Sequence, residues 1–370
     1  MGIIIGADFV PTESNYDLFA AGDSKALLGE ELLSIISSAR YRIFNLEGPL
    51  TDKETPIPKC GPNLIVPTGT INGYTAIGVD LLTIANNHIM DQDVLGFTST
   101  VNTLDEAGIA YVGGGHSLAE ASESYTFQWD GKTIGVYACA EHEFSIATET
   151  RCGANPFDPL WSLDHIEALR KSCDYVIVLY HGGKEHYRYP SPDLQKTCRR
   201  LVDKGADLVV CQHSHCIGCE EKYRDGTIVY GQGNFLFDHN DSEFWQTGLL
   251  VRIDEDWKIS YYPLVKHGNA ARLADAEKGR EIMDAFYARS EEIQKPGTVE
   301  MKYAEFAKDS FTRYMAAFRG KRSVIELAMN KLSHGGYLRH KYGTKELLAI
   351  RNYIECEAHR ELVISGAEYY

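Results

Sequence analysis

Short runs of β-branched and apolar residues alternate with segments of helical spacing over about the first 240 residues. Five runs are strand-sized and predict buried strands: Gly2–Ala7, Tyr41–Leu46, Leu81–Ala85, Tyr175–Tyr180 and Asp207–Gln212. Between them, apolar residues recur every three or four positions, which predicts helices over Lys25–Ala39, Thr70–Ile77, Leu95–Ala107 and Asp193–Lys204. Strands that alternate with helices indicate an α/β fold with parallel strands.

Turn residues predict antiparallel strands as well. Asp130-Gly131 is a strong hairpin signal between Ser122–Trp129 and Lys132–Ala140. Two further pairings follow, one through the turn Arg224-Asp225-Gly226 into Thr227–Tyr230, and one between Gly248–Ile253 and Lys258–Val265. The α/β region is therefore expected to end in antiparallel strands.

The pattern changes after about residue 270 to charged sequence of helical period. Helices are expected over Ala274–Ile293, Thr298–Phe318, Ser323–Leu332 and Lys345–Ala358. We therefore expect two domains, an α/β domain over residues 1–268 and an α-helical C-terminal region over residues 269–370.

Charge and composition narrow the classes of partner. Lys and Arg number 37 and Asp and Glu 52, which gives a net charge of −15. A field of this sign repels phosphate backbones and anionic lipid, so no nucleic-acid partner is expected, although a local cationic pocket remains compatible with it. The apolar runs are far shorter than the roughly 20 residues of a bilayer span, so no membrane anchor is expected. No signal peptide is recognisable, and nine scattered cysteines indicate reduced thiols, so we expect a cytoplasmic protein.

Residues able to ligate a metal follow five of the predicted strands. They are Asp8, Glu47, the segment Asn86-Asn87-His88-Ile89-Met90-Asp91, His181, and the pair His213 and His215. Ligands bind at the carboxyl ends of strands in open α/β sheets, and strand alternation sends His213 and His215 to one face. A mixed oxygen and nitrogen set favours Mn, Fe or Zn over Mg or Ca, with room for one or two ions. Any one of these residues alone is more simply a capping or hydrogen-bonded polar group.

Other polar residues leave alternatives open. Cys211, Cys216 and Cys219 have a spacing used for iron–sulfur ligation, but Cys211 is more simply a small apolar strand residue. Lys59, and less so Lys184 and Arg188, offer positive charge to an anionic substrate. Three residues near the candidate ligands either orient the imidazoles by hydrogen bonding or are ordinary turn residues: Asp91, Glu185 and Asn234.

Seven short motifs follow one another along the chain: Gly6-Ala7-Asp8, Asn45-Leu46-Glu47-Gly48-Pro49-Leu50, Lys59-Cys60-Gly61-Pro62, Ala85–Asp91, His181-Gly182-Gly183-Lys184-Glu185, His213-Ser214-His215 and Gly233-Asn234-Phe235. In this order they resemble the bacterial capsule synthesis protein family CapA, which is associated with poly-γ-glutamate and related to the calcineurin-like metallophosphoesterases. The resemblance covers roughly residues 1–265.

This resemblance implies a metallophosphatase-like sandwich of two β-sheets flanked by helices, to which the helical period after about residue 270 adds a helical C-terminal extension. It implies Asp8 and His215 as ligands of a first metal, with Glu47 as the bridging carboxylate. It implies Asn87, His181 and His213 as ligands of a second metal, and His88 as the catalytic group that stabilises or protonates a leaving group. Metallophosphoesterases carry Asp-x-His where this chain has Asp8-Phe9-Val10. The alternatives are therefore that the first metal binds weakly, that it is absent, or that another group such as Glu13 or Asn15 completes its site.

The function expected from these residues is a metal-dependent hydrolase. Its substrate would be a small-molecule or polymer anion with a phosphoester, γ-glutamyl or amide bond, in capsule or poly-γ-glutamate metabolism. The alternative is a non-catalytic assembly factor that binds a polymer or anion through a degenerate metal site. The sequence does not indicate an oligomeric state.

Overall fold

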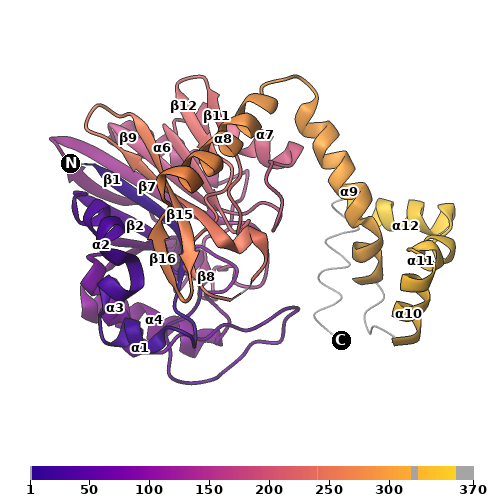
Figure 1. Cartoon of the computed structure of the whole chain (residues 1–370), viewed down its shortest axis with the longest axis horizontal. Helices are drawn as coiled ribbons and strands as arrows, with labels where there is room; N and C mark the ends of the chain where they lie inside the picture. Colours follow the sequence, from indigo (N-terminus) through magenta and orange to yellow (C-terminus); the bar gives the residue numbers. More distant parts are fainter. Residues whose placement is uncertain (1, 240, 318–323, 356–370) are drawn as a thin grey trace. The chain divides into compact units, whose positions relative to one another are not determined.

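The computed structural model describes residues 2–239, 241–317 and 324–355 (Figure 1). The chain divides into two compact units, Met1–Glu300 and Met301–Tyr370. The first unit thus ends later than residue 268, because helix α8 (Ala276–Glu292) packs on it. Ile282 and Phe286 of α8 form an apolar cluster with Ile217 and Leu249 of the α/β region.

One sheet of the first unit has eight strands, in the order β16-β15-β14-β1-β2-β3-β4 with β13 also paired to β1. Strand β1 is parallel to β2 and β13 and antiparallel to β14. The strands are β1 (Ile3–Val10), β2 (Tyr41–Asn45), β3 (Leu81–Thr83), β4 (Ala110–Val112), β13 (Asn234–Phe237), β14 (Thr247–Ile253), β15 (Ile259–His267) and β16 (Ala270–Leu273).

The other large sheet has six strands in the order β11-β12-β10-β9-β7-β6. Its four inner strands, β12, β10, β9 and β7, are parallel. The strands are β6 (Tyr125–Trp129), β7 (Lys132–Ala140), β9 (Tyr175–His181), β10 (Leu208–Gln212), β11 (Glu220–Tyr223) and β12 (Gly226–Val229). A short pair, β5 (Gly114–Gly115) and β8 (Gly153–Ala154), is separate.

The three expected antiparallel pairings are confirmed, between β6 and β7, β11 and β12, and β14 and β15. The β6–β7 turn has φ of 50° at Asp130 and 73° at Gly131. Positive φ at both central residues matches the twist of a two-residue hairpin, which is why Asp-Gly predicted it.

Successive side chains of a strand point to opposite faces of its sheet, so the apolar core is divided into layers. In β9, Ile177 and Leu179 join an apolar cluster that contains residues of both sheets and therefore lies between them. Their neighbours Val176 and Val178 join a different cluster, with residues of the helices that follow β8 and β9. This is the expected sandwich of two sheets flanked by helices.

The helices of the first unit cover the outer faces of the sheets. Figure 1 shows α1 to α4 gathered beside the first sheet. The helices are α1 (Tyr16–Ala20), α2 (Ser24–Ser37), η1 (Thr68–Thr70), α3 (Ile71–Ile77), α4 (Asp93–Ala107), α5 (Leu118–Ala121), α6 (Ser162–Ser172), α7 (Pro192–Asp203), η2 (Glu243–Gln246) and α8.

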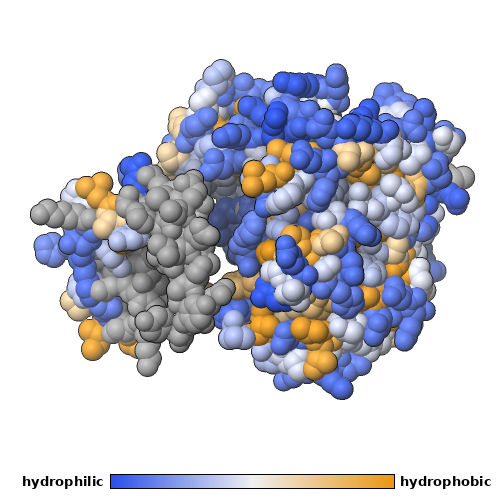
Figure 2. Space-filling model, turned by 180° about the vertical axis from the view of Figure 1, so that it is seen from behind, coloured by the Kyte–Doolittle hydropathy of each residue, from blue (hydrophilic) through white to orange (hydrophobic). Residues whose placement is uncertain are grey.

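The chain after α8 is helical, as expected. Helix α9 (Thr298–Ala317) is followed by α10 (Val324–Leu332), α11 (Gly336–Lys341) and α12 (Thr344–Glu355). Phe318, Ser323 and residues 356–358, which we expected in these helices, lie outside the described residues. No described helix combines the length and the apolar character needed to span a bilayer. The face in Figure 2 is mainly hydrophilic, with apolar residues in small separate groups.

Candidate metal centre

The candidate centre lies where the carboxyl ends of strands from both sheets meet. Asp8 is inside β1, at irregularities in its pairing with β2 and with β13, and lies opposite Asn45 and Asn234. A bulge of this kind redirects a side chain at a sheet edge. From the other sheet, His181 ends β9 and lies opposite Gln212 of β10. Asn45 spans the gap, with its Nδ2 2.7 Å from Asp8 Oδ1 and 3.3 Å from His181 Nδ1.

Five of the predicted residues form two overlapping groups of potential ligand atoms. One group is Asp8, Glu47 and His215, and the other is Glu47, His181 and His213. The ligand atoms in each group lie within 4.8 Å of one another, and all five residues are buried. Glu47 belongs to both groups.

Several atoms of these groups are buried without a hydrogen-bond partner. They are Oδ2 of Asp8, both carboxylate oxygens of Glu47 and Nδ1 of His213. Buried polar atoms in proteins are almost always hydrogen-bonded. Two of these oxygens face imidazole nitrogens without a well-formed hydrogen bond, with Oδ2 of Asp8 3.3 Å from Nδ1 of His215 and Oε1 of Glu47 3.5 Å from Nε2 of His181. The orphaned atoms therefore fit a bound cation, which would supply the missing interactions.

Electrostatics at the centre are dominated by burial and by the two carboxylates. Burial, helped by the charge of Asp8, raises the pKa of Glu47 to about 8. Burial works against His215, but Glu47 and Asp8 together raise its pKa to about 9. Burial lowers the pKa of His181 to about 4 and that of His213 well below its usual value. His181 and His213 are thus neutral at pH 7, the form in which imidazole ligates metals, whereas His215 is protonated and would lose its proton on binding an ion.

Asn87 is held against His181. Its Oδ1 lies 3.0 Å from His181 Nε2, and its Nδ2 donates to Oε2 of Glu143 at 2.7 Å. The Ser145 hydroxyl fixes the same loop by donating to the carbonyl of Asn87. An amide oxygen thus faces the group formed by Glu47, His181 and His213.

Lys59, His88 and Asp91 form a second cluster beside these groups. Nδ1 of His88 is 2.5 Å from Asp91 Oδ2 and 3.2 Å from Lys59 Nζ, and Lys59 donates to Oδ1 of Asp91. The side chains of Lys59 and Asp91 are 1% and 0% exposed. Asp91 therefore fixes both the imidazole of His88 and the ammonium group of Lys59.

His213 and His215 converge for a reason different from the expected one. Strand β10 ends at Gln212, so strand alternation does not apply to them. Instead, φ is 92° at His213 and 51° at His215. A positive φ is unfavourable for residues with a Cβ and is concentrated at functional sites. The bend turns both imidazoles toward Glu47.

The remaining expected residues divide into two sets. Asn234 Oδ1 lies 2.9 Å from Nδ1 of His215, whose ring also stacks on Trp245 at 4.4 Å. Glu185, in contrast, forms no hydrogen bond to an imidazole within the described part of the chain. Asn15 does not complete the first group, because its amide bonds the backbone of Thr12 and Asn269, and Glu13 is exposed.

Sequence reasoning missed Asn45, Glu143 and Ser145. Asn45 stood inside a quoted motif but was not singled out. Glu143 and Ser145 follow β7, which the sequence predicted only as one strand of a hairpin. Because β7 is also parallel to β9, its carboxyl end lies at the same edge as the other ligands. Glu141-His142-Glu143 after this strand was the available signal.

The hypothesis that the cysteines ligate an iron–sulfur cluster has no support in the described residues. Neither candidate ligand group contains a cysteine. Sγ of Cys211 lies 3.5 Å from Sγ of Cys198 in the apolar cluster under α7. The eight described cysteines are free.

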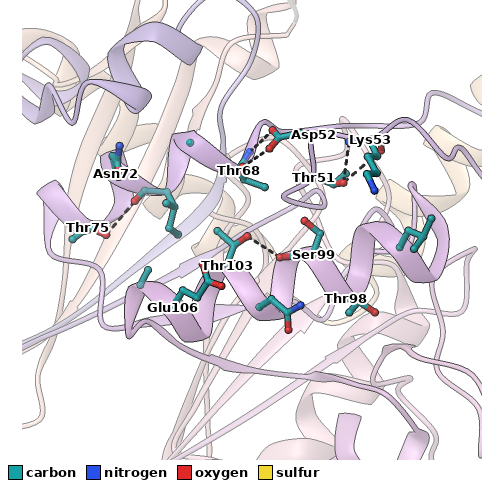
Figure 3. A pocket seen from close by; sticks show the side chains of 15 residues that line it. Thr51, Asp52, Lys53, Thr68, Asn72, Thr75, Thr98, Ser99, Thr103 and Glu106 are labelled. Carbon is teal, nitrogen blue, oxygen red and sulfur yellow. Dashed lines mark hydrogen bonds between the residues drawn. The ribbon is translucent and has the colours of Figure 1, made fainter.

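A groove of about 780 Å³ lies elsewhere, between α3, α4 and residues 51–53 (Figure 3). Its hydroxyl groups largely bond the protein itself. Thr75 and Thr103 donate to backbone carbonyls one turn earlier, and Thr68 bonds the carboxylate of Asp52. This groove lacks the buried, unpaired groups that distinguish the metal centre.

Comparison with known proteins agrees with the family resemblance of the sequence motifs. Residues 6–239 match the family described as bacterial capsule synthesis protein PGA_cap. The capsule biosynthesis protein CapA of Bacillus anthracis is 29% identical over 175 residues, which are 46% of this chain and 43% of that protein. The PGA biosynthesis protein CapA of Bacillus subtilis strain 168 is 32% identical over 161 residues, 43% of this chain and 42% of that protein. The match thus spans less than half the length of these curated relatives.

Among solved structures, similarity is weak. A phosphatase from Mycoplasma pneumoniae has a TM-score of 0.44 at 15% identity, covering 72% of this chain and 94% of that one. A putative 5'-nucleotidase from Staphylococcus aureus has a TM-score of 0.44 at 13% identity, covering 78% of this chain and 58% of that one.

Proposed function

Because this chain belongs to the bacterial capsule synthesis protein family PGA_cap, we propose that it is a divalent-metal-dependent hydrolase of capsule or poly-γ-glutamate metabolism. Its substrate is a small-molecule or polymer anion, cleaved at a phosphoester or at a γ-glutamyl or related amide bond. The relatives' names support the metabolic setting, since they include capsule and PGA biosynthesis proteins.

The observation that supports this proposal most is the set of orphaned buried atoms at Asp8, Glu47 and His213. Asp8, Glu47 and His215 would hold one ion, and Glu47, His181, His213 and Asn87 another. The imidazoles favour Mn, Fe or Zn over Mg or Ca. Bound ions of this kind supply Lewis-acid activation of water and of the scissile bond.

The chain's own residues then divide the remaining tasks. His88 exchanges a proton with the leaving group, and Asp91 holds the imidazole by its Nδ1 so that Nε2 faces away from the carboxylate. The buried ammonium group of Lys59 adds a fixed positive charge next to His88, where negative charge develops. Asn45 orients Asp8 and limits its rotation.

The test combines metal content with turnover. Protein purified without chelator is analysed by mass spectrometry, saturated with Mn and assayed with bis(4-nitrophenyl) phosphate and with γ-glutamyl-4-nitroanilide. We expect one or two ions per chain and hydrolysis of at least one probe. His181→Ala should lose both metal and turnover, whereas His267→Ala, an exposed histidine at the end of β15, should keep both. Full turnover in the His181 variant contradicts the proposal.

A second candidate function is a non-catalytic anion- or polymer-binding assembly factor. The observation that favours it is Val10, which is 2% exposed and packs in the apolar core, so it contributes no ligand to the Asp8 group. This candidate predicts that anionic ligands raise the melting temperature without being cleaved. Hydrolysis that scales with both protein and metal concentration excludes it.

A further inference from the structure

A cleft of about 560 Å³ lies beside η2 and is lined by several charged side chains. It is bounded by η2, the start of β14, the end of β15 and one face of α8. Its charged lining residues are Arg188, Lys266, Lys278 and Arg289, with Glu243 and Glu281. Four cations and two anions make this a local excess of positive charge in a chain of net charge −15.

The two lysines of the cleft are neutralised by neighbouring carboxylates. Lys266 pairs with Asp238 at 2.7 Å, and Lys278 pairs with Glu281 at 2.7 Å. With both lysines paired, the cleft keeps two arginines against one carboxylate, that of Glu243, which is an excess of one positive charge.

Neither guanidinium group has a strong carboxylate partner. Arg188 is 3.7 Å from Glu243, whose side chain is 77% exposed, and an exposed pair at this distance contributes little. Arg289 forms no ion pair with any described residue. Burial and the charge of Arg188 lower the pKa of Arg289, as expected for adjacent like charges.

The backbone holds the two guanidinium groups together. Nη2 of Arg289 and Nη1 of Arg188 each lie 3.2 Å from the carbonyl oxygen of Ile217, and Nε of Arg289 donates to the carbonyl of Gly218 at 2.8 Å. Arg289 thus uses two of its five N–H donors on the protein. The others remain for a ligand, and a planar guanidinium is suited to two-point contact with a carboxylate or a phosphate.

We propose that this cleft is an anion-binding site, in which Arg188 and Arg289 together hold a carboxylate or phosphate group. The site is separate from the candidate metal centre but adjacent to it through η2. Within this turn, Trp245 stacks on His215, while the ring of Phe244 lies 4.8 Å below the guanidinium of Arg188. Side chains of η2 thus contact both an arginine of the cleft and an imidazole of the metal centre. Binding itself does not depend on the proposed function, whereas a role in turnover does.

The experiment is calorimetric titration of the full-length protein at low salt, with inorganic pyrophosphate in one series and tricarballylate in another. We expect saturable binding that weakens with added salt. Arg289→Gln should weaken it about tenfold or more, because a charge-assisted contact is lost. Glu243→Gln should tighten it about two- to fivefold, because an anion leaves the rim. Misfolding cannot raise the affinity. The Glu243→Gln result therefore keeps the test valid even if Arg289→Gln disturbs the local fold.

Two control variants locate the binding. Glu30→Gln removes the same charge from an exposed position on α2, where the side chain is 82% exposed, and should bind like the wild type. His213→Asn alters the metal centre and should also leave cleft binding unchanged. Binding of only one of the two anions identifies the ligand as a phosphate or as a carboxylate.

Three outcomes overturn the proposal: no saturable binding, equal tightening in Glu243→Gln and Glu30→Gln, or loss of binding in His213→Asn. The last would place the anion at the metal centre and would leave the proposed function intact. Conversely, cleft binding by a protein that hydrolyses neither chromogenic probe would contradict the proposed function and leave the cleft intact.

Discussion

The side chain of Asn234 contacts the candidate centre through His215, to whose Nδ1 its amide oxygen is bonded at 2.9 Å. Outer partners of this type fix the orientation of a ligating imidazole, and their loss typically lowers metal affinity about 10- to 100-fold. We expect that loss for Asn234→Ala in a competition titration with a metal-sensitive dye. Asn102→Ala, an exposed residue of α4, makes the same chemical change and should have no effect. Unchanged affinity in Asn234→Ala would show that Asn234 does not support the metal.

Lys59 and Asp91 form a buried ion pair whose two members depend on each other. Removing one member of such a pair costs about 3–5 kcal/mol, because the other charge stays buried without compensation. Asp91→Asn should lower the free energy of unfolding by about that amount in urea denaturation. The double variant Lys59→Met with Asp91→Asn should recover most of it.

Activity separates the structural role of this pair from its proposed catalytic role. The double variant regains stability but leaves His88 without its carboxylate and its neighbouring cation. We therefore expect it to remain slow with both chromogenic probes. Full activity in the stable double variant would mean that Lys59 and Asp91 only support the fold.

Most residues of the centre were predictable because each follows a run whose strand character is local. Asp8, Glu47 and His181 stand next to short runs of apolar and β-branched residues, and such runs alone predict their strands. The convergence of His213 and His215 was expected for the wrong reason, since strand β10 ends before them and both residues have positive φ. Glu185 interacts electrostatically with His213 but forms no hydrogen bond to an imidazole within the described residues, so proximity in sequence predicted its neighbourhood and not its geometry.

At the scale of elements, α8 belongs to the α/β unit through one face. Phe286 is fully buried against Tyr261 of β15, with ring centroids 4.9 Å apart, whereas its neighbour Tyr287 is 45% exposed. Phe286→Ala should lower the free energy of unfolding by about 3–5 kcal/mol, and Tyr287→Ala should cost well under 1 kcal/mol. Thermal denaturation of both variants measures the difference. Equal effects would mean that α8 is not anchored by Phe286.

The helices and strands themselves were predicted better than their packing partners. The helical period of α8 was recognisable in the sequence. It does not indicate which unit the apolar face of the helix packs against, so the domain boundary was placed too early in the sequence. The role of the β7 end was missed for a related reason. Its hairpin with β6 is local, whereas its parallel pairing with β9 joins segments about 40 residues apart.

At the scale of the molecule, the contacts predict where the chain can be shortened. A protein ending at residue 300 keeps α8 and the whole candidate centre, so it should unfold cooperatively and be stabilised by Mn, by about 2.7 kcal/mol at a hundredfold excess over Kd. A protein ending at residue 268 exposes the apolar cluster of Ile217 and Leu249. It should aggregate or unfold at lower temperature, which calorimetry will show. Equal stability of the two would contradict the observed division.

The candidate ligands come from different sheets: Asp8 and Glu47 from the first, and the three imidazoles from the second. An ion held between them would act as a cross-link, comparable to the disulfide that joins the sheets of a secreted sandwich. Such a link slows the separation of the layers more than it changes either layer. The rate of unfolding, and of amide exchange in β1 and β9, would then report whether the cross-link is in place.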